Sequence, residues 1–397
     1  MLQTWRWFGP LDKTSLTDVA QAGATGIVSA LHHVPAGEVW TRAEIAKRRK
    51  LIEDGGLVWS VVESLAVSEE IKLGAPEFAA HCAAWRESLE NLAAEGIFVV
   101  CYNFMPVIDW TRTDLAWHLP HGGTAMRFDL VDFAAFDIHI AERKGAAEGH
   151  GKALADAAAE RFAQMSEERR KGLTAAITAG LPGTDRSLTL DDVREALGAW
   201  DGISAETLAA NQTAFLREVV PTAERLGMRL CCHPDDPPVA LLGLPRIIST
   251  EADYKRMVDA VDSPANGITF CTGSLGARAD NDLPGMVKRL GDKIHFLHLR
   301  NVRHQAGPGE APYTSFFESD HLDGNVDMVA VIRAVLAEEA RRAAEGRADA
   351  QIPMRPDHGH DLADDLKRGA QPGYPTVGRI KGLAELRGVE IALKAGA

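Results

Sequence analysis

The chain has 397 residues, of which 46% are hydrophobic and 25% charged, as in an ordinary soluble globular protein. Lys and Arg number 43 against 56 Asp and Glu, so the formal net charge is −13. This balance argues against a nucleic-acid-binding protein, which usually carries a basic face. It leaves room for a small anionic substrate, because a local cluster of Arg or His can oppose the global charge.

The cysteine content and the N-terminus concern the compartment. Five cysteines at irregular spacing (Cys82, Cys101, Cys231, Cys232 and Cys271) do not fit a secreted disulfide framework. The first residues show no basic region followed by an apolar stretch. No uncharged apolar run approaches the roughly 20 residues of a membrane-spanning helix. We therefore expect a soluble, cytoplasmic protein that does not associate with membranes.

Short apolar runs alternate with longer amphipathic segments along the chain. The runs, rich in Val, Ile or aromatic residues, are predicted strands over 5–8, 25–30, 58–62, 97–102, 229–232, 267–271, 294–299 and 352–354. Helical patterns cover 43–54, 76–94, 207–226 and 326–344. Strands that alternate with helices pair in parallel through right-handed crossovers. About eight such units predict an α/β fold, a closed (β/α)8 TIM barrel, with residues 1–397 as a single barrel domain.

Residues 141–200 interrupt this alternation with a segment rich in Ala, Glu, Arg and Lys. We interpret it as a helical insertion after the fourth strand, with one helix over 152–170 and another that begins at Thr189 as N-cap. It could simply decorate the barrel, or act as a lid or dimer contact. Residues 303–312 are predicted as a flexible loop.

The active site of such a barrel lies at the C-terminal ends of its strands. His233, Cys271, His298 and Asp357 follow or end the last four predicted strands, so the fold would bring them to one rim. These side chains are typical ligands of a divalent cation. Each alone is more often structural, and Cys271 alone is more often a buried apolar residue. Their coincidence on successive strands favours a metal site, whereas Cys231 and Cys232 are predicted core residues.

Other polar residues follow the same strands, namely Arg300, Asn301, Asp320 and His321. Each of them could form a surface ion pair. Together around a metal, they suit an anionic, hydroxyl-rich ligand such as a sugar acid. The sequence has neither a phosphate-binding Gly-rich loop with Lys, nor a dinucleotide fingerprint, nor a Ser nucleophile elbow.

Several longer motifs resemble those of the bacterial D-mannonate dehydratases that have a xylose-isomerase-like barrel. They lie at 6–9, 26–33, 37–40, 101–106, 232–238, 269–274, 298–302, 318–321, 355–359 and 378–388. The resemblance covers essentially the whole chain. Residues 11–13 and the loop around Pro375 look divergent, and they concern the edges of the pocket rather than the metal cluster.

This resemblance implies the dehydration of D-mannonate to 2-dehydro-3-deoxy-D-gluconate in hexuronate breakdown. It also implies one Mn²⁺ or Fe²⁺ per chain, a homo-oligomer of two or more chains, and His358 and Tyr374 as the acid–base pair. The residue types alone would favour zinc, because a thiolate is a soft ligand. Which of His358 and Tyr374 is the base stays open.

Two other functions fit the same residues. One is a sugar or sugar-acid isomerase or epimerase, which would use the same metal and proton abstraction without loss of water. The other is a sugar-acid sensor, which would need no acid and base beside the metal. The presence of His358 and Tyr374 argues against the sensor.

Overall fold

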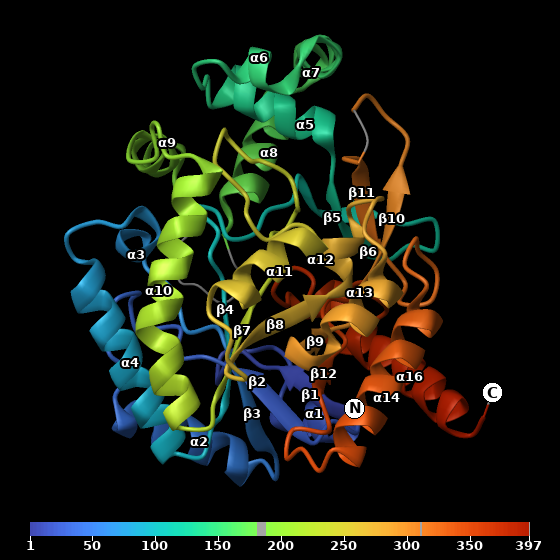
Figure 1. The fold of residues 1–397 in the computed structure, drawn as a ribbon. Coiled ribbons are helices and arrows are strands. Elements are labelled where there is room, and N and C mark those ends of the chain that lie inside the picture. The colour runs from blue at the N-terminus through green and yellow to red at the C-terminus, as the bar shows by residue number, and fades with distance from the viewer. Residues whose placement is uncertain (181–187, 310–311, 397) are drawn as a thin grey trace.

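A closed barrel of eight parallel strands is the centre of the molecule (Figure 1). The computed structural model describes residues 1–180, 188–309 and 312–396. Around the barrel the order is β1-β12-β9-β8-β7-β4-β3-β2. The strands are β1 (Leu2–Arg6), β2 (Gly26–Ser29), β3 (Val58–Glu63), β4 (Val99–Tyr102), β7 (Arg229–Cys232), β8 (Asn266–Cys271), β9 (Ile294–His298) and β12 (Pro353–Arg355). The predicted barrel is confirmed, and each of the eight predicted strands overlaps an observed one. The first, predicted over 5–8, begins three residues earlier and ends two residues earlier.

Helices pack around the outside of this barrel. They are α1 (Leu16–Gln21), α2 (Arg42–Asp54), α3 (Glu69–Leu73), α4 (Phe78–Ala94), α10 (Ala205–Arg225), α11 (Glu251–Ala260), α12 (Thr272–Gly276), α13 (Leu283–Leu290), α14 (Met328–Ala344), α15 (Asp365–Arg368) and α16 (Thr376–Lys394). The four helices predicted from periodicity correspond to α2, α4, α10 and α14. Side chains cap their starts where the sequence offers them, as Thr41 does for α2 and Ser204 for α10.

The barrel interior contains a small apolar layer below the catalytic rim. Val28, Val61, Cys101, Cys231 and Phe296 form this layer, one residue from each of five strands. Cys231 and Cys232 are both fully buried, as predicted for core residues. This layer lies directly below the strand ends. On β9, the next inward-facing residue after Phe296 is His298, and the centroids of these two rings are 4.7 Å apart. The layer therefore supports His298 from below.

A second sheet was missed by the sequence analysis. Its four strands are β5 (Asp114–His118), β6 (Thr124–Phe128), β10 (Asn301–Gln305) and β11 (Ser315–Ser319), in the order β10-β11-β6-β5, and the pairs are antiparallel. The prediction of a flexible loop over 303–312 is wrong for its first three residues, which belong to β10. Residues 310–311 of that loop lie outside the described residues. These strands belong to the segments that follow β4 and β9, so the sheet lies at the C-terminal rim of the barrel.

The insertion contains α6 (Ala146–His150), α7 (Lys152–Gln164), α8 (Glu167–Thr178) and α9 (Leu190–Gly198), preceded by α5 (Leu130–Ala135) and a π-helix over Phe136–Ile140. The single helix predicted over 152–170 is wrong. Met165 is extended, and the Ser166 side chain starts α8 by accepting a hydrogen bond from the Arg169 amide at 3.1 Å. Thr189 caps α9 as predicted. Residues 181–187 lie outside the described residues.

The insertion shares its apolar core with the second sheet. Leu154 of α7 and Leu173 of α8 belong to the same cluster as Phe128, Val302 and Phe316 of the sheet. In Figure 1 these helices lie at the top, above the strand ends. The insertion is therefore packed on the sheet that borders the rim.

The apolar layer yields a stability prediction. Replacing Phe296 with Ala should lower the free energy of unfolding by about 3–5 kcal/mol, because it leaves a cavity inside the barrel. Urea unfolding followed by tryptophan fluorescence measures this change. The control is Ile391→Ala on the outer helix α16, where the side chain is 60% exposed and the expected change is within about 0.5 kcal/mol. Equal losses in the two variants would contradict the role of the layer.

Candidate active site

Three side chains predicted as metal ligands converge at the rim of the barrel. His233 directly follows β7, Cys271 is the last residue of β8, and His298 is the last residue of β9. One possible ligand atom from each lies within 4.8 Å of the others. Cys271 and His298 are fully buried. The parallel strands place them together because β7, β8 and β9 are neighbours in the barrel.

Local hydrogen bonds orient these three side chains. Nδ1 of His233 lies 2.7 Å from the Pro234 carbonyl, which only accepts, so Nδ1 carries the proton of the neutral ring and Nε2 carries a lone pair. That Nε2 lies 3.1 Å from Nδ1 of His298. The Cys271 sulfur accepts from the Ser274 hydroxyl at 3.1 Å and the Ser274 amide at 3.5 Å. Both contacts fix the position of the sulfur at the start of α12.

The fourth predicted ligand, Asp357, lies beside this cluster. It follows β12 by two residues. Its Oδ2 is 3.5 Å from the Cys271 sulfur, and its Oδ1 is 3.9 Å from Nδ1 of His298. It also forms ion pairs with Arg355 at 2.6 Å and Arg300 at 3.1 Å. The structure thus brings the four predicted ligands to one place.

A network of buried charges surrounds the cluster. The Arg112 guanidinium binds both oxygens of Asp236, at 2.7 and 3.1 Å, and donates to Glu318 at 2.8 Å. Arg300 donates to Asp236 at 2.7 Å and lies 3.4 Å from Glu318. Arg355 binds both oxygens of Glu63 at 2.7 and 2.9 Å. The prediction that Arg300 lies beside the pocket is consistent with this placement.

The arginines keep the buried acids ionised. Burial alone would raise the pKa of Glu318, but His358, Arg300 and Arg112 lower it to about 2. Burial also opposes ionisation of Asp236, yet Arg112 and Arg300 hold its pKa well below the usual range. For Glu63, burial is again outweighed by Arg355 and His298, and its pKa is well below normal. In this part of the rim, four carboxylates face three guanidinium groups, and a fourth guanidinium, that of Arg6, donates to the Glu63 carbonyl.

His358 and Tyr374, predicted as the acid–base pair, line a cavity that two of the four predicted ligands also line. The cavity has a volume of about 40 Å³, and His233, Arg300, Arg355 and Asp357 also line it. Nδ1 of His358 is 2.8 Å from Glu318, and its ring is 4.9 Å from that of Tyr374. Burial raises the pKa of Tyr374 to about 12, so its phenol is protonated at neutral pH.

Glu63 and Asn103 also line this cavity, and the sequence analysis did not select them. Glu63 is the last residue of β3, and Asn103 directly follows β4. Both positions obey the strand-end rule that identified the other residues. The rule was applied only to the last four strands, and extending it to β3 and β4 would have found them.

Three residues predicted to bind substrate do not line the cavity. The Asn301 side chain donates to the carbonyls of His321 and Val326 and accepts from two backbone amides, so it fastens the loop after β11. Asp320 pairs with the Lys381 ammonium. His321 is buried against Gly382, and burial lowers its pKa to about 4. The structure separates these residues from the metal cluster.

A second group of possible ligands lies near these residues. His121, Asp320 and His360 offer ligand atoms within 4.8 Å of one another. The Lys381 ammonium already pairs with Asp320 there, and the Gly123 amide donates to Nδ1 of His121 at 3.2 Å. The Lys381 ammonium therefore balances the negative charge of Asp320. For this reason we do not interpret these three residues as a metal site.

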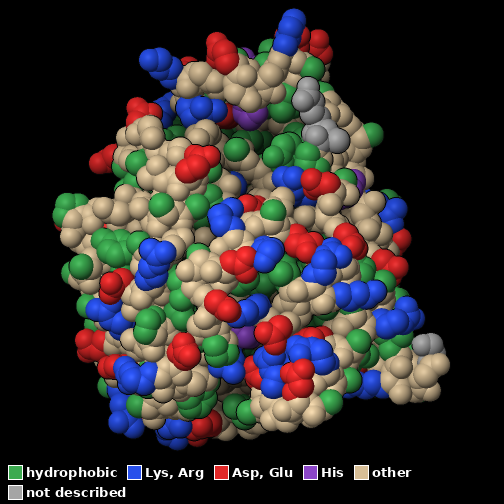
Figure 2. Space-filling view, in the orientation of Figure 1, with side chains coloured by type: hydrophobic (Ala, Val, Ile, Leu, Met, Phe, Trp, Pro, Cys, Tyr) green, Lys and Arg blue, Asp and Glu red, His purple; other side chains and the backbone are tan. Residues whose placement is uncertain are grey.

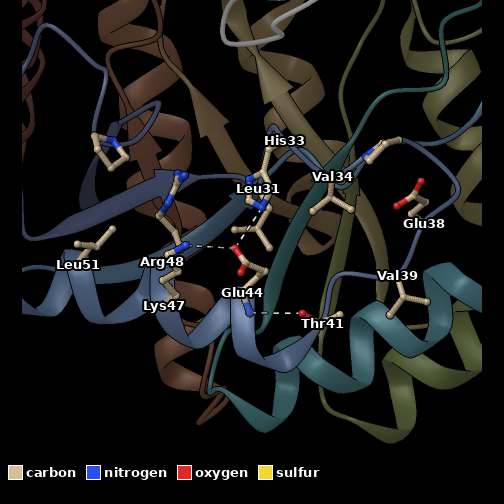
Figure 3. A pocket seen from close by; sticks show the side chains of 12 residues that line it. Leu31, His33, Val34, Glu38, Val39, Thr41, Glu44, Lys47, Arg48 and Leu51 are labelled. Carbon is tan, nitrogen blue, oxygen red and sulfur yellow. Dashed lines mark hydrogen bonds and ion pairs between the residues drawn. The ribbon is translucent and has the colours of Figure 1, made fainter.

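A wide pocket of about 650 Å³ lies elsewhere, between the loop after β2 and helix α2 (Figure 3). Its polar side chains pair with one another. Glu44 lies 3.2 Å from His33 and 3.9 Å from Lys47, and its amide donates to Thr41 at 3.4 Å. None of the predicted metal ligands lines it. The chemistry therefore points to the smaller cavity at the strand ends rather than to this pocket.

One face of the outer surface is seen in Figure 2. On the face in Figure 2, acidic and basic side chains are mixed without a broad field of one sign. Among the described residues, no helix is both long and apolar enough to span a membrane.

Comparison with known proteins agrees with the geometry of the rim. The model of the D-mannonate dehydratase (UxuA) family matches residues 1–397. The chain belongs to this family. Members of the family are metal-dependent dehydratases.

Individual members of the D-mannonate dehydratase family are similar over their whole length. A mannonate dehydratase of Rhizobium meliloti (strain 1021) is 58% identical, over 99% of this chain and 97% of that protein. Mannonate dehydratase 1 of Agrobacterium fabrum is 57% identical, over 100% of this chain and 98% of that protein. The crystal structure of the Streptococcus suis enzyme superposes with a TM-score of 0.76 at 32% identity, covering 100% of this chain and 94% of that one.

The residues at the rim fit the divalent ion that the family implies. Two imidazoles, a thiol and a carboxylate are a complete donor set for such an ion. Two ligand nitrogens at about 2.1 Å from one ion lie roughly 3 Å apart, and the His233 and His298 nitrogens are 3.1 Å apart.

The low pKa of Glu318 predicts how stability depends on pH. Because its pKa falls from 4.5 to about 2 on folding, its ionisation stabilises the folded state above pH 4.5, and this contribution is lost as the pH falls toward 2. Glu318→Gln should therefore lower the free energy of unfolding at pH 7 by roughly 3–5 kcal/mol. The difference in free energy of unfolding between the variant and the wild type should become smaller below pH 4.5.

Urea unfolding at pH 7, 5 and 4 tests this prediction. The control is Glu218→Gln, because the exposed pair of Glu218 with Arg86 should contribute less than about 1 kcal/mol. If the difference in free energy of unfolding between the wild type and Glu318→Gln stays constant over this pH range, the low pKa of Glu318 in the folded state is contradicted.

Proposed function

We propose that this chain converts D-mannonate to 2-dehydro-3-deoxy-D-gluconate and water, in hexuronate breakdown. The single observation that carries the proposal is the cavity at the rim. Two potential metal ligands, His233 and Asp357, line it together with His358 and Tyr374, and the other two, Cys271 and His298, lie directly beside those ligands. A divalent ion, a base and an acid are the groups that loss of water from a sugar acid would use. Membership of the D-mannonate dehydratase family identifies the sugar acid.

We propose that His233, Cys271, His298 and Asp357 hold one Mn²⁺ or Fe²⁺. When bound, such an ion acts as a Lewis acid that stabilises negative charge on the substrate carboxylate or a neighbouring hydroxyl. The choice of manganese or iron over zinc follows the family resemblance. The thiolate alone would favour a softer or more tightly bound metal.

The elimination needs two proton transfers at defined atoms. A base takes the proton from carbon 2, the electrons of that bond form the double bond to carbon 3, and hydroxide leaves carbon 3. An acid protonates the departing hydroxide, so the products are an enol and water. The enol then tautomerises: its hydroxyl on carbon 2 loses a proton, carbon 3 gains one, and the product is the 2-keto-3-deoxy acid.

We assign the base to His358 and the acid to Tyr374. The phenol of Tyr374 is protonated at neutral pH because burial raises its pKa to about 12, so it can give a proton to the hydroxide. His358 lies 2.8 Å from the Glu318 carboxylate, which can stabilise the imidazolium that forms when the ring takes a proton. Arg300 lines the cavity and is proposed to contact the substrate as well as Asp236.

Other assignments follow from the fold. For Asn301, Asp320 and His321 we propose support of the loop after β11 instead of contact with the substrate. We infer that 1–397 is one barrel domain that includes the 141–200 insertion, because the insertion shares an apolar cluster with the sheet at the rim.

Incubation of the metal-loaded protein with D-mannonate tests the function. We expect formation of a 2-keto-3-deoxy acid, measured by a colorimetric assay for that class, and no formation after removal of the metal. An isomeric or epimeric acid with no loss of water would identify an isomerase or epimerase instead. Tight binding of D-mannonate with no product would indicate a sensor.

The metal ligands yield a separate prediction. Cys271→Ser replaces an anionic sulfur with a neutral hydroxyl, and His298→Ala removes a nitrogen ligand, so both variants should lose most of the bound metal and the activity with it. Metal content by mass spectrometry of dialysed protein measures the change. Cys82→Ser, which alters a buried cysteine of α4, is the control and should keep its metal. Wild-type metal content in both ligand variants would refute the cluster.

The acid–base pair should behave differently from the ligands. His358→Asn and Tyr374→Phe should retain the metal and lose turnover by at least about a hundredfold, because general acid–base groups contribute about 10²–10⁴-fold. Tyr313→Phe, in the loop between β10 and β11, is the matched control and should keep wild-type turnover. If His358→Asn loses metal and turnover in parallel while Tyr374→Phe stays active, the two residues only support the site.

A further inference from the structure

Glu63 reaches the metal cluster from a strand on the other side of the barrel. It ends β3, whereas the predicted ligands come from β7, β8, β9 and β12. Its carboxylate lines the cavity and is held by two hydrogen bonds from Arg355, at 2.7 and 2.9 Å. Arg355 in turn donates to Asp357 at 2.6 Å. Glu63 is thus connected to one proposed ligand through a single guanidinium group.

Glu63 also faces a second proposed ligand directly. Its Oε2 lies 3.4 Å from Nε2 of His298. Within the described part of the chain, this Nε2 is buried and forms no hydrogen bond. The other ring nitrogen, Nδ1, points to the cluster, at 3.1 Å from Nε2 of His233 and 3.9 Å from Oδ1 of Asp357. The two nitrogens of His298 therefore have separate surroundings.

These surroundings determine which nitrogen can bind a metal. A carboxylate only accepts hydrogen bonds, so the proton of neutral His298 is best placed on Nε2, toward Glu63. This leaves the lone pair on Nδ1. Nε2 of His233 also carries a lone pair, because its Nδ1 donates to the Pro234 carbonyl. The two lone pairs then lie 3.1 Å apart, and the Arg355 guanidinium lies 3.4 Å from Nδ1 of His298, so a positive group already faces this nitrogen.

We propose that Glu63 is a positioning residue of the metal centre, which holds His298 in the tautomer that ligates through Nδ1. Histidine ligands commonly donate their second nitrogen to a carboxylate, and loss of that partner typically costs 10–100-fold in metal affinity. Glu63 also positions a second ligand. It fixes Arg355, and Arg355 holds the Asp357 carboxylate beside the cluster. One side chain thereby orients two of the four ligands.

The competing account makes Glu63 only an ion-pair partner that keeps Arg355 folded. Both accounts expect a less stable Glu63→Gln variant. They differ at the metal, because only the positioning role requires a change in how His298 binds it. The test therefore compares metal affinity and metal spectrum, and it does not depend on which substrate the enzyme uses.

Metal-free full-length protein is titrated with Mn²⁺, and the free ion is followed by electron paramagnetic resonance. Glu63→Gln should raise the Kd for Mn²⁺ by about 10–100-fold. The matched control is Glu95→Gln, a buried glutamate paired with Arg42 and Arg49 at the end of α4 that leads into β4, away from the rim. Its Kd should equal that of the wild type. An unchanged Kd in Glu63→Gln overturns the proposal.

The Co²⁺-loaded proteins give the second readout. We expect the visible d–d bands of Glu63→Gln to differ from those of the wild type, because the His298 donor is no longer fixed. A weaker affinity with identical bands would overturn the proposal in favour of the ion-pair account. If Glu63→Gln does not fold, Glu63→Asp keeps the charge on Arg355 and withdraws the carboxylate from His298. The same two measurements on that variant carry the same expected and contradicting results.

Discussion

Buried ion pairs at the C-terminal rim of the barrel determine most of the geometry described above. Arg112, Arg300 and Arg355 are each almost fully buried, and each bridges two acidic residues that come from different strands or loops. Removing one partner of such a pair leaves an uncompensated buried charge, at a cost of about 3–5 kcal/mol. The carboxylates are therefore held at fixed positions around a cavity that they share with the proposed ligands.

This network explains why the rim suits both a cation and an anionic substrate. The carboxylates and the Cys271 sulfur supply acceptors for a cation, and the arginines that pair with those carboxylates supply donors for an anion such as a sugar acid. The same arginines keep Glu318 ionised beside His358, the residue proposed as the base.

The sequence predicts the barrel and the proximity of the four proposed ligands, and the reason is general. Parallel strands are buried on both faces and appear as short apolar runs, and their C-terminal ends meet at one rim. His233, Cys271, His298 and Asp357 therefore come together from strand order alone. His358 and Tyr374 were selected by family resemblance, since one histidine after a ligand and one tyrosine in a loop carry little signal by themselves.

Features that depend on tertiary contacts could not be predicted in the same way. The strands β5, β6, β10 and β11 lack a clear apolar alternation, and they exist because loops from two strand ends pair with each other. The break at Met165 was missed because Ser166 competes as a helix cap inside a strongly helical composition. Asn301 lies close to the proposed ligand His298 in the sequence. Its side-chain amide, however, forms hydrogen bonds with the backbone of the loop after β11.

The central claim is that the strand ends of this barrel hold one catalytic divalent ion. Anomalous scattering from crystals of the active, Mn²⁺-loaded enzyme tests it most directly. The account predicts a manganese peak within bonding distance of His233, Cys271, His298 and Asp357, next to His358 and Tyr374. A catalytically active crystal with its manganese bound elsewhere, and none at this cluster, would contradict it.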